Sequence, residues 1–530
     1  MLVDCIDPNQ SGHFSKLILD YLNNEDNLKP LYNRFPTLEN FADQIQEKQN
    51  NFTTKDRELL VTAIQQQYHD KKNISEATKH NIAKLEQQNC FTITTGHQLN
   101  LFSGPVYYLY KILSVINLSE QLKNKYSNYD FVPVFWMATE DHDFEEINHF
   151  KFRDKKIVFN SEEKGPVGRF STQGLDRVLK SIEKEFGTST KANHLISLFK
   201  QAYLEHNTLA EATFFLTNEI FKDFGILIVN GDCSILKSNF KEQVKDELFN
   251  EVLYNNVNES SSLLKNYHIQ VNPREINLFY IENGIRERIL QENDFYKINN
   301  TNLSFSSSEI LELINKNPER FSPNAIFRPI YQETVLPNLA YIGGGGELAY
   351  WLELKTSFKA FNKTFPILVH RDAVLLVSKK LDKKIKSLNL TYSELFLNTK
   401  DLYTKKTFEF SDLTLDFSSL KKQLQKQFKE LETIAEKTDV SFKTALQAQQ
   451  TKQLKGLENL EKRLVKAEGK LLKNKIERII KIQEELFENQ GLQERKQNFS
   501  EFYIDSEENL INVLKKELNP LKSGFKVIVI

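Results

Sequence analysis

The stretch "FTITTGHQLNLFSGPVYYLYKI", residues 91–112, decides the fold. An alternating β-type run ends at Gly96 and His97, a short polar turn with Gly104 and Pro105 follows, and a helical pattern then begins. A strand that enters a helix through a glycine turn leaves backbone N–H groups unpaired, and such groups attract anions. The stretch therefore predicts an anion site, or else a plain turn whose histidine satisfies a local carbonyl.

A strand, helix and strand pattern continues from residue 91 to about residue 150. This βαβ unit is typical of a parallel sheet with right-handed crossovers, so we predict an α/β fold with a parallel-sheet core. Later strand candidates carry few charges, as strands covered on both faces do. They are "GILIVN" (225–230), "LAYIG" (339–343) and "FPILVHRDAVLLV" (365–377).

Composition bounds the class of protein. A chain of 530 residues predicts two to four domains, and 70 basic against 71 acidic residues give no field that would favour nucleic acid as a partner. The longest apolar run, residues 132–138, is too short to span a membrane, and the first residues lack the pattern of a signal peptide. Three widely spaced cysteines fit a reducing cytoplasm, where we expect the protein.

The texture of the sequence predicts four regions. Apolar residues recur at intervals of three and four from Phe417 to Ile434 and again from Leu457 to Leu471, after which the seam steps by one residue to Leu472. This pattern predicts an antiparallel coiled-coil arm whose long seam needs a second copy of the chain, hence a homodimer. The regions are a helical lead-in packed on the core (1–90), the core with insertions at about 151–222 and 255–320 (91–414), the coiled-coil dimerisation arm (415–489) and a segment that returns to the core (490–530).

An acidic cluster follows the second strand of the βαβ unit, in "MATEDHDFEEINHF" (137–150). We expect Glu140, Asp141, His142 and Asp143 at the carboxyl-terminal edge of the sheet, beside the first turn. Carboxylates next to an imidazole can bind a cation, bind sugar hydroxyls or hold a general base, and the sequence does not distinguish these roles. A solvated acidic loop is the structural alternative.

A run of four glycines lies in "RPIYQETVLPNLAYIGGGGELAYWLELK" (328–355). Gly343–Gly346, between a strand and a helix that begins near Glu347, predict a cradle of N–H groups for a phosphate or carboxylate. The run is not a Walker A loop, because no Gly-Lys-Ser/Thr follows. Arg328 could supply a bidentate anion contact, with Gln332 and Glu333 as polar orienting groups. A tight packing turn is the alternative.

Five motifs together resemble the BshC family, the cysteine ligases of bacillithiol synthesis. They are "TTGHQLNLFSGPVYYLYK", "VPVFWMATEDHDFEEINH", the glycine-run motif above, "FPILVHRDAVLLV" and the late "GLQER". The resemblance implies a Rossmann-like core related to class I aminoacyl-tRNA synthetases and pantothenate synthetases, two connecting insertions and a coiled-coil dimerisation arm. Nucleotidyl-transferring relatives of this core carry HxGH at the first turn, whereas this chain has Thr94-Thr95-Gly96-His97.

The function that the resemblance implies is the addition of L-cysteine to glucosaminyl-malate, with an amide formed between the cysteine carboxyl group and the sugar amine. A carboxylate does not acylate an amine at neutral pH without activation, so ATP, with or without Mg²⁺, is the expected co-substrate and no tightly bound metal is expected. We assign catalysis to His97, Asp141, His142 and Asp143. Substrate or nucleotide binding is assigned to Thr95, Gly96, Gln98, Asn100, Trp136, Glu140, Asn148, Arg328, Gln332, Glu333, Gly343, Gly344, Gly345, Gly346, Glu347 and Trp351.

Two other functions fit the same residues. A metal-dependent amino-sugar hydrolase or deacetylase would use His97, Asp141, His142 and Asp143 as metal ligands. A non-catalytic scaffold built around the coiled coil would leave the glycine turns as packing features.

Overall fold

The computed structural model describes residues 1–530 and divides the chain into two compact units. The first comprises Met1–Asn9, His13–Ser378 and Glu494–Ile530, and the second comprises Gln10–Gly12 and Lys379–Gln493. The second unit therefore begins before residue 415, where the sequence placed the start of the arm. The reason is that helix α20 (Thr399–Phe410) packs on the arm helices α22 (Val440–Leu471) and α23 (Lys473–Leu486).

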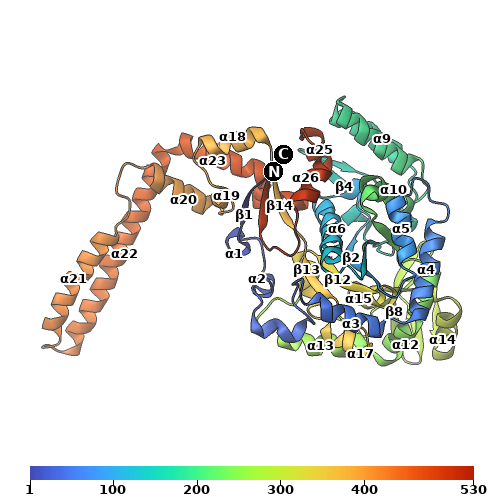
Figure 1. The fold of residues 1–530 in the computed structure, drawn as a ribbon. Coiled ribbons are helices and arrows are strands. Elements are labelled where there is room, and N and C mark those ends of the chain that lie inside the picture. Colours follow the sequence, from blue (N-terminus) through green and yellow to red (C-terminus); the bar gives the residue numbers. More distant parts are fainter. The chain divides into compact units, whose positions relative to one another are not determined.

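A five-stranded parallel sheet forms the centre of the first unit (Figure 1). Its spatial order is β13-β12-β2-β3-β6. The chain adds β3 and β6 on one side of β2 and then β12 and β13 on the other side, so the strand order reverses between β2 and β12. This is a Rossmann-like order, and the predicted parallel-sheet core is confirmed. The strands are β2 (Cys90–His97), β3 (Asp130–Met137), β6 (Leu227–Asn230), β12 (Asn338–Gly343) and β13 (Ile367–His370).

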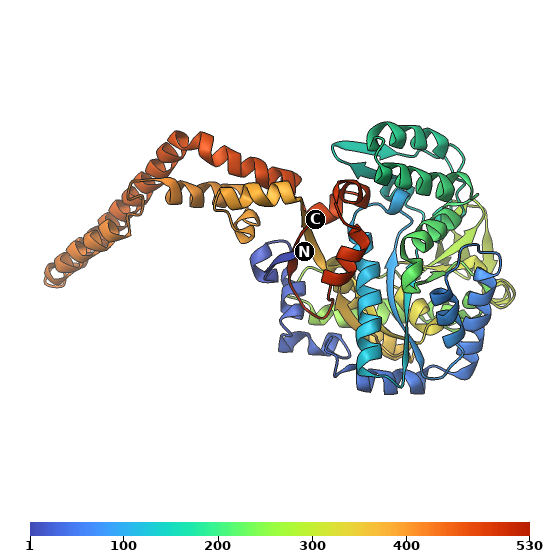
Figure 2. The same cartoon turned by 45° about the horizontal axis from the view of Figure 1, so that its top comes forward.

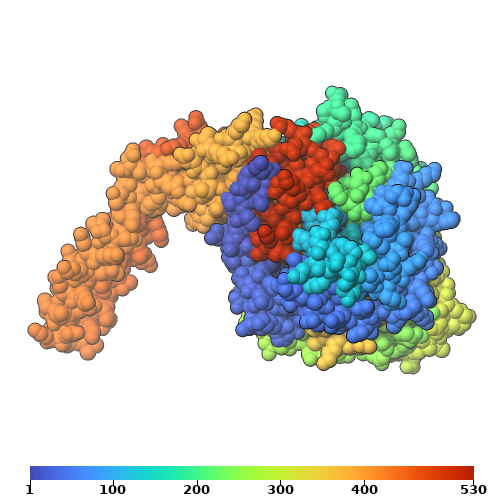
Figure 3. Space-filling view, in the orientation of Figure 1, coloured from blue at the N-terminus to red at the C-terminus, as the bar shows by residue number.

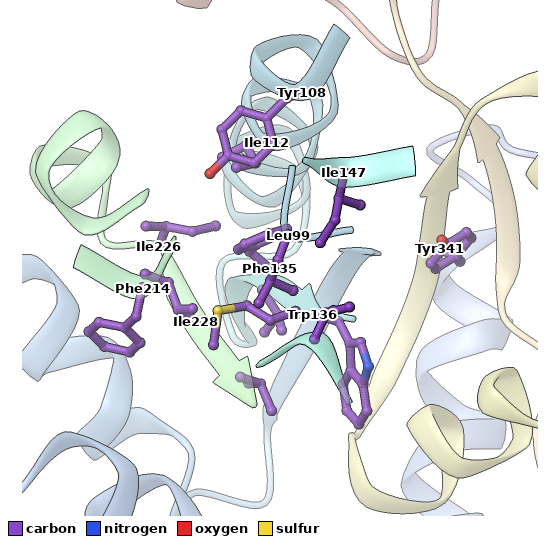
Figure 4. Close-up of a cluster of buried hydrophobic side chains, with 14 of the residues drawn as sticks. Leu99, Tyr108, Ile112, Phe135, Trp136, Ile147, Phe214, Ile226, Ile228 and Tyr341 are labelled. Carbon is purple, nitrogen blue, oxygen red and sulfur yellow. The ribbon is translucent and has the colours of Figure 1, made fainter. Parts of the chain in front are cut away.

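Helix α6 (Tyr107–Lys125) connects β2 to β3 and packs on both strands. All eight residues of β2 are buried, which explains why the strand carries no charged residue. Figure 4 shows part of the core beneath this connection, where Phe135 of β3 lies among Ile226, Ile228 and Leu99, with Tyr108 of α6 above. Burial on both faces of the sheet fixes the carboxyl ends of the strands, where the site is built.

The predicted strand 365–377 is two strands in different sheets, which corrects the sequence analysis. β13 ends at His370, Arg371 and Asp372 form a connection, and β14 (Ala373–Val377) joins a second sheet of order β1-β15-β14. The break occurs because both charged residues are buried and paired with distant partners. Arg371 pairs with Glu494 at 2.6 Å, and Asp372 pairs with Lys526.

The two ends of the chain pair with each other in this second sheet. β1 (Leu2–Ile6), which the helical prediction for residues 1–90 missed, runs antiparallel to β15 (Phe525–Val529). Figure 3 shows the first residues beside the last ones on the surface. The final segment belongs to the first unit and adds α24 (Gln493–Lys496), α25 (Phe499–Asp505) and α26 (Leu510–Glu517).

The lead-in is otherwise helical. The stretch "TTKDRELL" (53–60) begins with an N-terminal capping box, in which Thr53 and Asp56 accept each other's backbone N–H groups at the start of helix α4. α3 packs on β12 and α4 on β6, so these helices cover the sheet. The helices are α1 (Pro8–Ser11), α2 (Lys16–Leu22), α3 (Phe41–Asn51), α4 (Thr54–Tyr68) and α5 (Glu76–Lys84).

Two insertions extend the core. Between β3 and β6 lie α7 (Phe144–Ile147), the hairpin β4 (His149–Phe152) and β5 (Lys155–Val158), and the helices α8 (Leu175–Phe186), α9 (Thr190–Leu204) and α10 (Leu209–Phe221). Between β6 and β12 lie the helices α11 (Ser234–Asn239), α12 (Lys241–Asn250), α13 (Val252–Leu263), α14 (Ser307–Lys316) and α15 (Arg328–Val335). They flank an antiparallel sheet of β7 (Leu278–Glu282), β8 (Ile285–Glu292), β9 (Phe295–Ile298), β10 (Ser304–Ser306) and β11 (Phe321–Pro323). After β12 come α16 (Gly345–Trp351) and α17 (Lys355–Ala360).

The second unit contains the predicted antiparallel hairpin. α21 (Ser418–Ala435) lies against α22, as Figures 1 and 2 show. The long helix stops at Leu472, the residue at which the apolar seam steps by one position, and α23 begins at Lys473. The remaining helices of the unit are α18 (Lys379–Ser387), α19 (Tyr392–Leu395) and α20. No helix of the chain is long and apolar enough to cross a membrane.

Candidate active site

A cavity of about 650 Å³ opens at the carboxyl ends of β2, β3 and β12. This is the point at which the strand order of the sheet reverses, and open α/β sheets bind ligands there. Four of the predicted residues come from the ends of β2 and β3: Gly96, His97, Gln98 and Trp136. Five more come from the loop after β3 and from α15 and α16: Glu140, Asp141, His142, Arg328 and Glu347. Three segments that the sequence singled out separately thus meet in one cavity.

Asp141 lines the cavity, and hydrogen bonds fix the position of its carboxylate. Its Oδ2 accepts a hydrogen bond from Gln98 Nε2 at 2.9 Å, and its Oδ1 accepts the backbone N–H of His142 at 2.8 Å. Partial burial raises the pKa of Asp141, but these hydrogen bonds and the nearby Arg286 outweigh it and hold the pKa well below its ordinary value. The carboxylate is therefore ionised throughout the neutral pH range.

The neighbouring acids behave differently. Glu140 forms a buried ion pair with Lys237 of α11, so its charge is already compensated. Asp143 is exposed and does not line the cavity, which corrects the prediction that it lies in the site beside Asp141. The reason is local, because the chain turns at Asp143 into the short helix α7. Asn148, at the end of α7, bonds to His149 and also lies outside the cavity.

β2 includes Gly96 and ends at His97, where the sequence predicts the end of the strand, and Gly96 itself forms no turn. The residues with positive φ are Phe102, Ser103 and Gly104, in the loop that follows. A Cβ added at position 96 would lie 3.4 Å from the Tyr341 hydroxyl, at the limit of ordinary van der Waals contact. Asn498 ties the loop down by donating to the carbonyls of Phe102 and Gly104.

His97 is a buried, neutral imidazole. Its ring packs against Tyr107 and Tyr108, with ring centroids 5.3 and 5.2 Å apart. Burial, followed by the charge of Lys111, lowers the pKa of His97 to about 3. Its Nε2 atom has no hydrogen-bond partner in the protein. His97 therefore brings no positive charge to the site at neutral pH, and its role in catalysis stays a prediction for a neutral imidazole.

The glycine run is likewise not an open cradle. The N–H of Gly344 donates to Glu347 Oε2 at 2.9 Å, so the carboxylate of the same helix already occupies the position expected for a ligand. None of Gly343–Gly346 lines the cavity. At Gly343 an added Cβ would lie 3.0 Å from the Tyr341 ring, so close packing accounts for glycine there.

Other predicted residues do not line the cavity and contact strands and loops next to it. Thr95 donates to the carbonyl of Ile342, and Trp351 stacks on Tyr341 with ring centroids 4.4 Å apart. Asn100 lies under the loop after β2, against Gly104. Glu333 is fully buried, where Asn338 donates to it and Lys48 lies 3.3 Å away. Gln332 accepts a hydrogen bond from Arg328 at 2.8 Å and thereby holds a cavity residue.

Two arginines line the cavity without a carboxylate within 4 Å. Arg328 donates to Gln332 and to the Tyr350 hydroxyl, and its guanidinium lies 5.6 Å from the Tyr341 ring centroid. Burial opposes its charge, but Tyr350, Tyr341 and Glu347 hold the pKa of Arg328 above its ordinary value. Arg286, from β8, lies 4.0 Å from the Phe279 ring centroid and 2.7 Å from His142 Nδ1.

Sequence reasoning missed Arg286, Lys111, Tyr341 and Tyr350 as cavity residues. Arg286 comes from an antiparallel sheet about 145 residues beyond Asp141 in the chain, and no local pattern links the two. Tyr341 and Tyr350 lie within the glycine-run motif, in which the sequence analysis assigned ligand binding to the glycines and not to the tyrosines. Lys111 lies in the quoted opening stretch, and its signal was a lysine flanked by apolar and aromatic residues in "YYLYKIL" (107–113).

Comparison with known proteins identifies the family. The description "Bacillithiol biosynthesis BshC, N-terminal Rossmann-like domain" matches residues 1–372, and "Bacillithiol biosynthesis BshC, C-terminal coiled-coil domain" matches residues 374–530. The chain belongs to the BshC family. Relatives named "Putative cysteine ligase BshC" from Flavobacterium psychrophilum and Flavobacterium johnsoniae are 53% and 52% identical, and each alignment covers 100% of this chain and 99% or 100% of the relative. One from Christiangramia forsetii is 48% identical over 100% of this chain and 99% of the relative.

The two BshC family models meet at residue 373, where the structure changes sheets between β13 and β14. Membership confirms the resemblance, the Rossmann-like fold and the coiled-coil domain, and it places the chain among ligases of bacillithiol biosynthesis.

The geometry counts against the metal-dependent hydrolase. His97, Asp141 and His142 line the cavity and Asp143 does not, and no group of three or more His, Cys, Asp or Glu side chains in the chain could hold a metal ion. His97 is buried, whereas Asp143 faces solvent.

Proposed function

We propose that this BshC protein joins the carboxyl group of L-cysteine to the amine of glucosaminyl-malate in the last step of bacillithiol biosynthesis, with ATP as co-substrate. The names of the relatives support a cysteine ligase, and the charges of the cavity support the substrates. The size of the cavity also fits, since sites for small molecules commonly occupy roughly 300–1,000 Å³.

The observation that carries the proposal is the meeting of unlike charges in one cavity. Asp141 is an ionised carboxylate with no lysine or arginine within 4 Å, and Arg286 and Arg328 are guanidinium groups with no carboxylate within 4 Å. Cysteine and glucosaminyl-malate each carry an amine together with one or more carboxylates. Guanidinium groups bind carboxylate and phosphate oxygens, and a carboxylate binds an ammonium, so the cavity complements both substrates.

The low pKa of Asp141 restricts its role. A carboxylate that holds its proton so weakly is a poor general base, because proton transfer is efficient when the pKa lies near the working pH. Asp141 therefore orients an amine group. It does not remove the proton that the amine loses when the amide forms.

The side chains of the site are better suited than its glycine loop to bind the phosphates of ATP. The carboxyl group of cysteine must be activated before an amine can attack it, and phosphate oxygens need cationic partners. Arg328 and Arg286 are available on the cavity wall, whereas the Gly344 amide is occupied by Glu347. We therefore assign the phosphates to the cationic side chains. Activation as an acyl-adenylate and as an acyl-phosphate are both compatible with this arrangement.

The test is a product assay by mass spectrometry. Purified protein is incubated with L-cysteine, ATP and glucosaminyl-malate, and we expect the mass of the amide-linked thiol. Omission of each substrate in turn should abolish the product, and the nucleotide released, AMP or ADP, distinguishes the two modes of activation. Absence of product with all three substrates, in protein shown to be folded, contradicts the proposal.

A further inference from the structure

Lys111 is a buried ammonium group in the wall of the cavity. It lies in the second turn of α6, a helix whose residues from Tyr108 to Ser119 are all buried, and its side chain is only 5% exposed. Burying an ammonium ion costs several kcal/mol unless partners compensate the lost hydration. A lysine at this place therefore needs partners, and the identity of those partners indicates what it does.

The protein supplies two acceptors for three N–H donors. Lys111 Nζ donates to the carbonyl of Gly96 at 2.7 Å and lies 2.6 Å from Glu347 Oε2. Glu347 is itself shared, because its Oε2 also accepts the Gly344 N–H and its Oε1 accepts the Tyr341 hydroxyl. An ammonium has three donors and no acceptor. One N–H of Lys111 is left without a protein partner, on a residue that lines the cavity.

The charges around Lys111 leave room for an anion. The groups that face it are Glu347 from α16, Arg328 from α15, Arg371 from the connection after β13, and the neutral His97 from β2. The charge of Arg371 is paired with Glu494, and Glu347 is the one carboxylate that serves both Lys111 and Arg328. This part of the wall carries more positive than negative charge, and a bound anion would balance it.

We propose that Lys111 donates its third N–H to an anionic oxygen of a ligation substrate, either a carboxylate or a phosphate oxygen, at the carboxyl end of β2. The assignment rests on the proposed function and adds a binding residue to it. Because Gly96 O and Glu347 fix two of the donors, the third has a set direction and needs no reorganisation when the anion arrives. On this proposal, the anion that residues 91–112 predict is bound by a side chain of α6, whereas the sequence analysis had placed it at the turn.

A paired substitution separates this role from a structural one. Lys111→Met together with Glu347→Gln removes both charges, keeps the side-chain volumes and leaves an acceptor for the Gly344 N–H. Replacing a whole buried ion pair with neutral groups is often neutral for stability, whereas breaking one partner is costly. The matched control is Lys406→Met with Glu394→Gln, which removes a buried lysine and glutamate pair of the second unit, at 2.7 Å, outside the cavity.

Binding is measured by calorimetry with L-malate, L-cysteine and ATP, each alone, at fixed salt. We expect the Lys111→Met/Glu347→Gln variant to lose roughly tenfold or more in affinity for at least one of them, and the control to match the wild type. Loss for ATP alone assigns the phosphate, and loss for malate or cysteine assigns the carboxylate. Wild-type affinity for all three probes in the folded variant overturns the assignment. A wild type that binds none of them overturns the proposed function as well.

Glu347→Gln alone provides a second test in which Lys111 stays in place. Burial already lowers the pKa of Lys111 and the Glu347 carboxylate opposes that effect, so removal of the carboxylate lowers the pKa further. Affinity for the anion should then fall at a lower pH than in the wild type, and return when the pH is lowered again. The same alkaline limit in both proteins would overturn the assignment, because a lysine that does not touch the ligand leaves this profile unchanged.

Discussion

At the scale of single residues, Asp141 and Asp143 form a natural pair for comparison. Asp141 lines the cavity and is held by Gln98, whereas Asp143, two residues later, is exposed and outside it. Asp141→Asn removes one charged hydrogen-bond acceptor for the substrate amine, which is worth about 2–3 kcal/mol. We expect kcat/KM to fall roughly 30- to 150-fold with the thermal midpoint within a few degrees of the wild type.

Asp143→Asn is the matched control, and it should keep activity near that of the wild type. Both variants are compared by product formation and by thermal unfolding. Equal losses of activity in both would show that the loop acts as a unit and that the cavity does not single out Asp141.

Glu347 gives a prediction about stability and pH. Burial raises its pKa, but Lys111, the Gly344 amide and the Tyr341 hydroxyl outweigh burial and bring the pKa to about 2. A carboxylate whose pKa is lower in the folded state stabilises the protein above its unfolded pKa, about 4.3, and loses that effect as the pH falls toward 2. The stability difference between the wild type and Glu347→Gln should therefore shrink between about pH 5 and pH 2. Urea unfolding across this range measures it, and a difference that stays constant with pH would contradict the assignment.

The site residues that could be predicted from the sequence are those next to the end of a strand. Asp141 and Gly96 follow directly from the rule that parallel strands present their carboxyl ends at one edge. Lys111 and Arg286 depend on tertiary contacts, since one lies inside a helix and the other on an inserted sheet. The protonation of His97 also depends on burial that no local pattern reports.

At the scale of elements, the connections at the strand ends differ in whether they tolerate a side chain in place of a glycine. A Cβ at Gly231, after β6, would lie 2.6 Å from the ring of Trp136, which is fully buried and packed edge-on against Tyr331. Gly231→Ala must therefore displace a rigid ring in the cavity wall, and we expect a loss of about 1–3 kcal/mol in the free energy of unfolding.

Gly344→Ala is the control for this prediction. At Gly344 the nearest atom to an added Cβ is 3.6 Å away and φ is negative, so the substitution should be tolerated within about 0.5 kcal/mol. Urea unfolding compares the two variants. A Gly344→Ala variant that is as destabilised as Gly231→Ala would mean that the glycine run is under a constraint that these contacts do not show.

Elements with strong periodicity were predictable, and those defined by distant partners were not. β2, α6 and β3 carry their patterns locally, and they form the strand, helix and strand that the sequence predicts from residue 91 onward. β13 and β14 read as one strand because the ion pairs that separate them are made with Glu494 and Lys526, more than 120 residues away. β1 is short and exposed except at its end, so its partner β15 defines it more than its own residues do.

At the scale of the whole molecule, the sequence foresaw a Rossmann-like core and a coiled-coil arm but placed their border too late. The seam at residues 417–471 is visible as a heptad-like repeat, whereas α18, α19 and α20 lack such a repeat and read as core. Their attachment to α22 and α23 depends on packing, for example the hydrogen bond from the Tyr403 hydroxyl to the carbonyl of Gly469.

The arm makes the last prediction, which concerns assembly. Within the hairpin, Phe428, Ala435 and Leu446 bury one another. Other apolar residues of the two helices stay exposed, among them Leu431, Ile434 and Leu460. Exposed apolar side chains on both helices of a coiled coil favour a second copy of the chain, so we expect a homodimer. Leu431→Glu with Leu460→Glu places charges among them and should give a monomer by light scattering.

Phe295→Glu is the control, because Phe295 is equally exposed but belongs to the first unit, and this variant should stay dimeric. A dimer that persists in the Leu431→Glu/Leu460→Glu protein, or a wild type that is monomeric at micromolar concentration, would contradict the prediction. Because these exposed apolar residues lie on α21 and α22 while the cavity lies in the first unit, the monomeric variant should keep its affinity for single substrates. Loss of substrate affinity together with the dimer would instead show that a second copy of the chain is needed to complete the site.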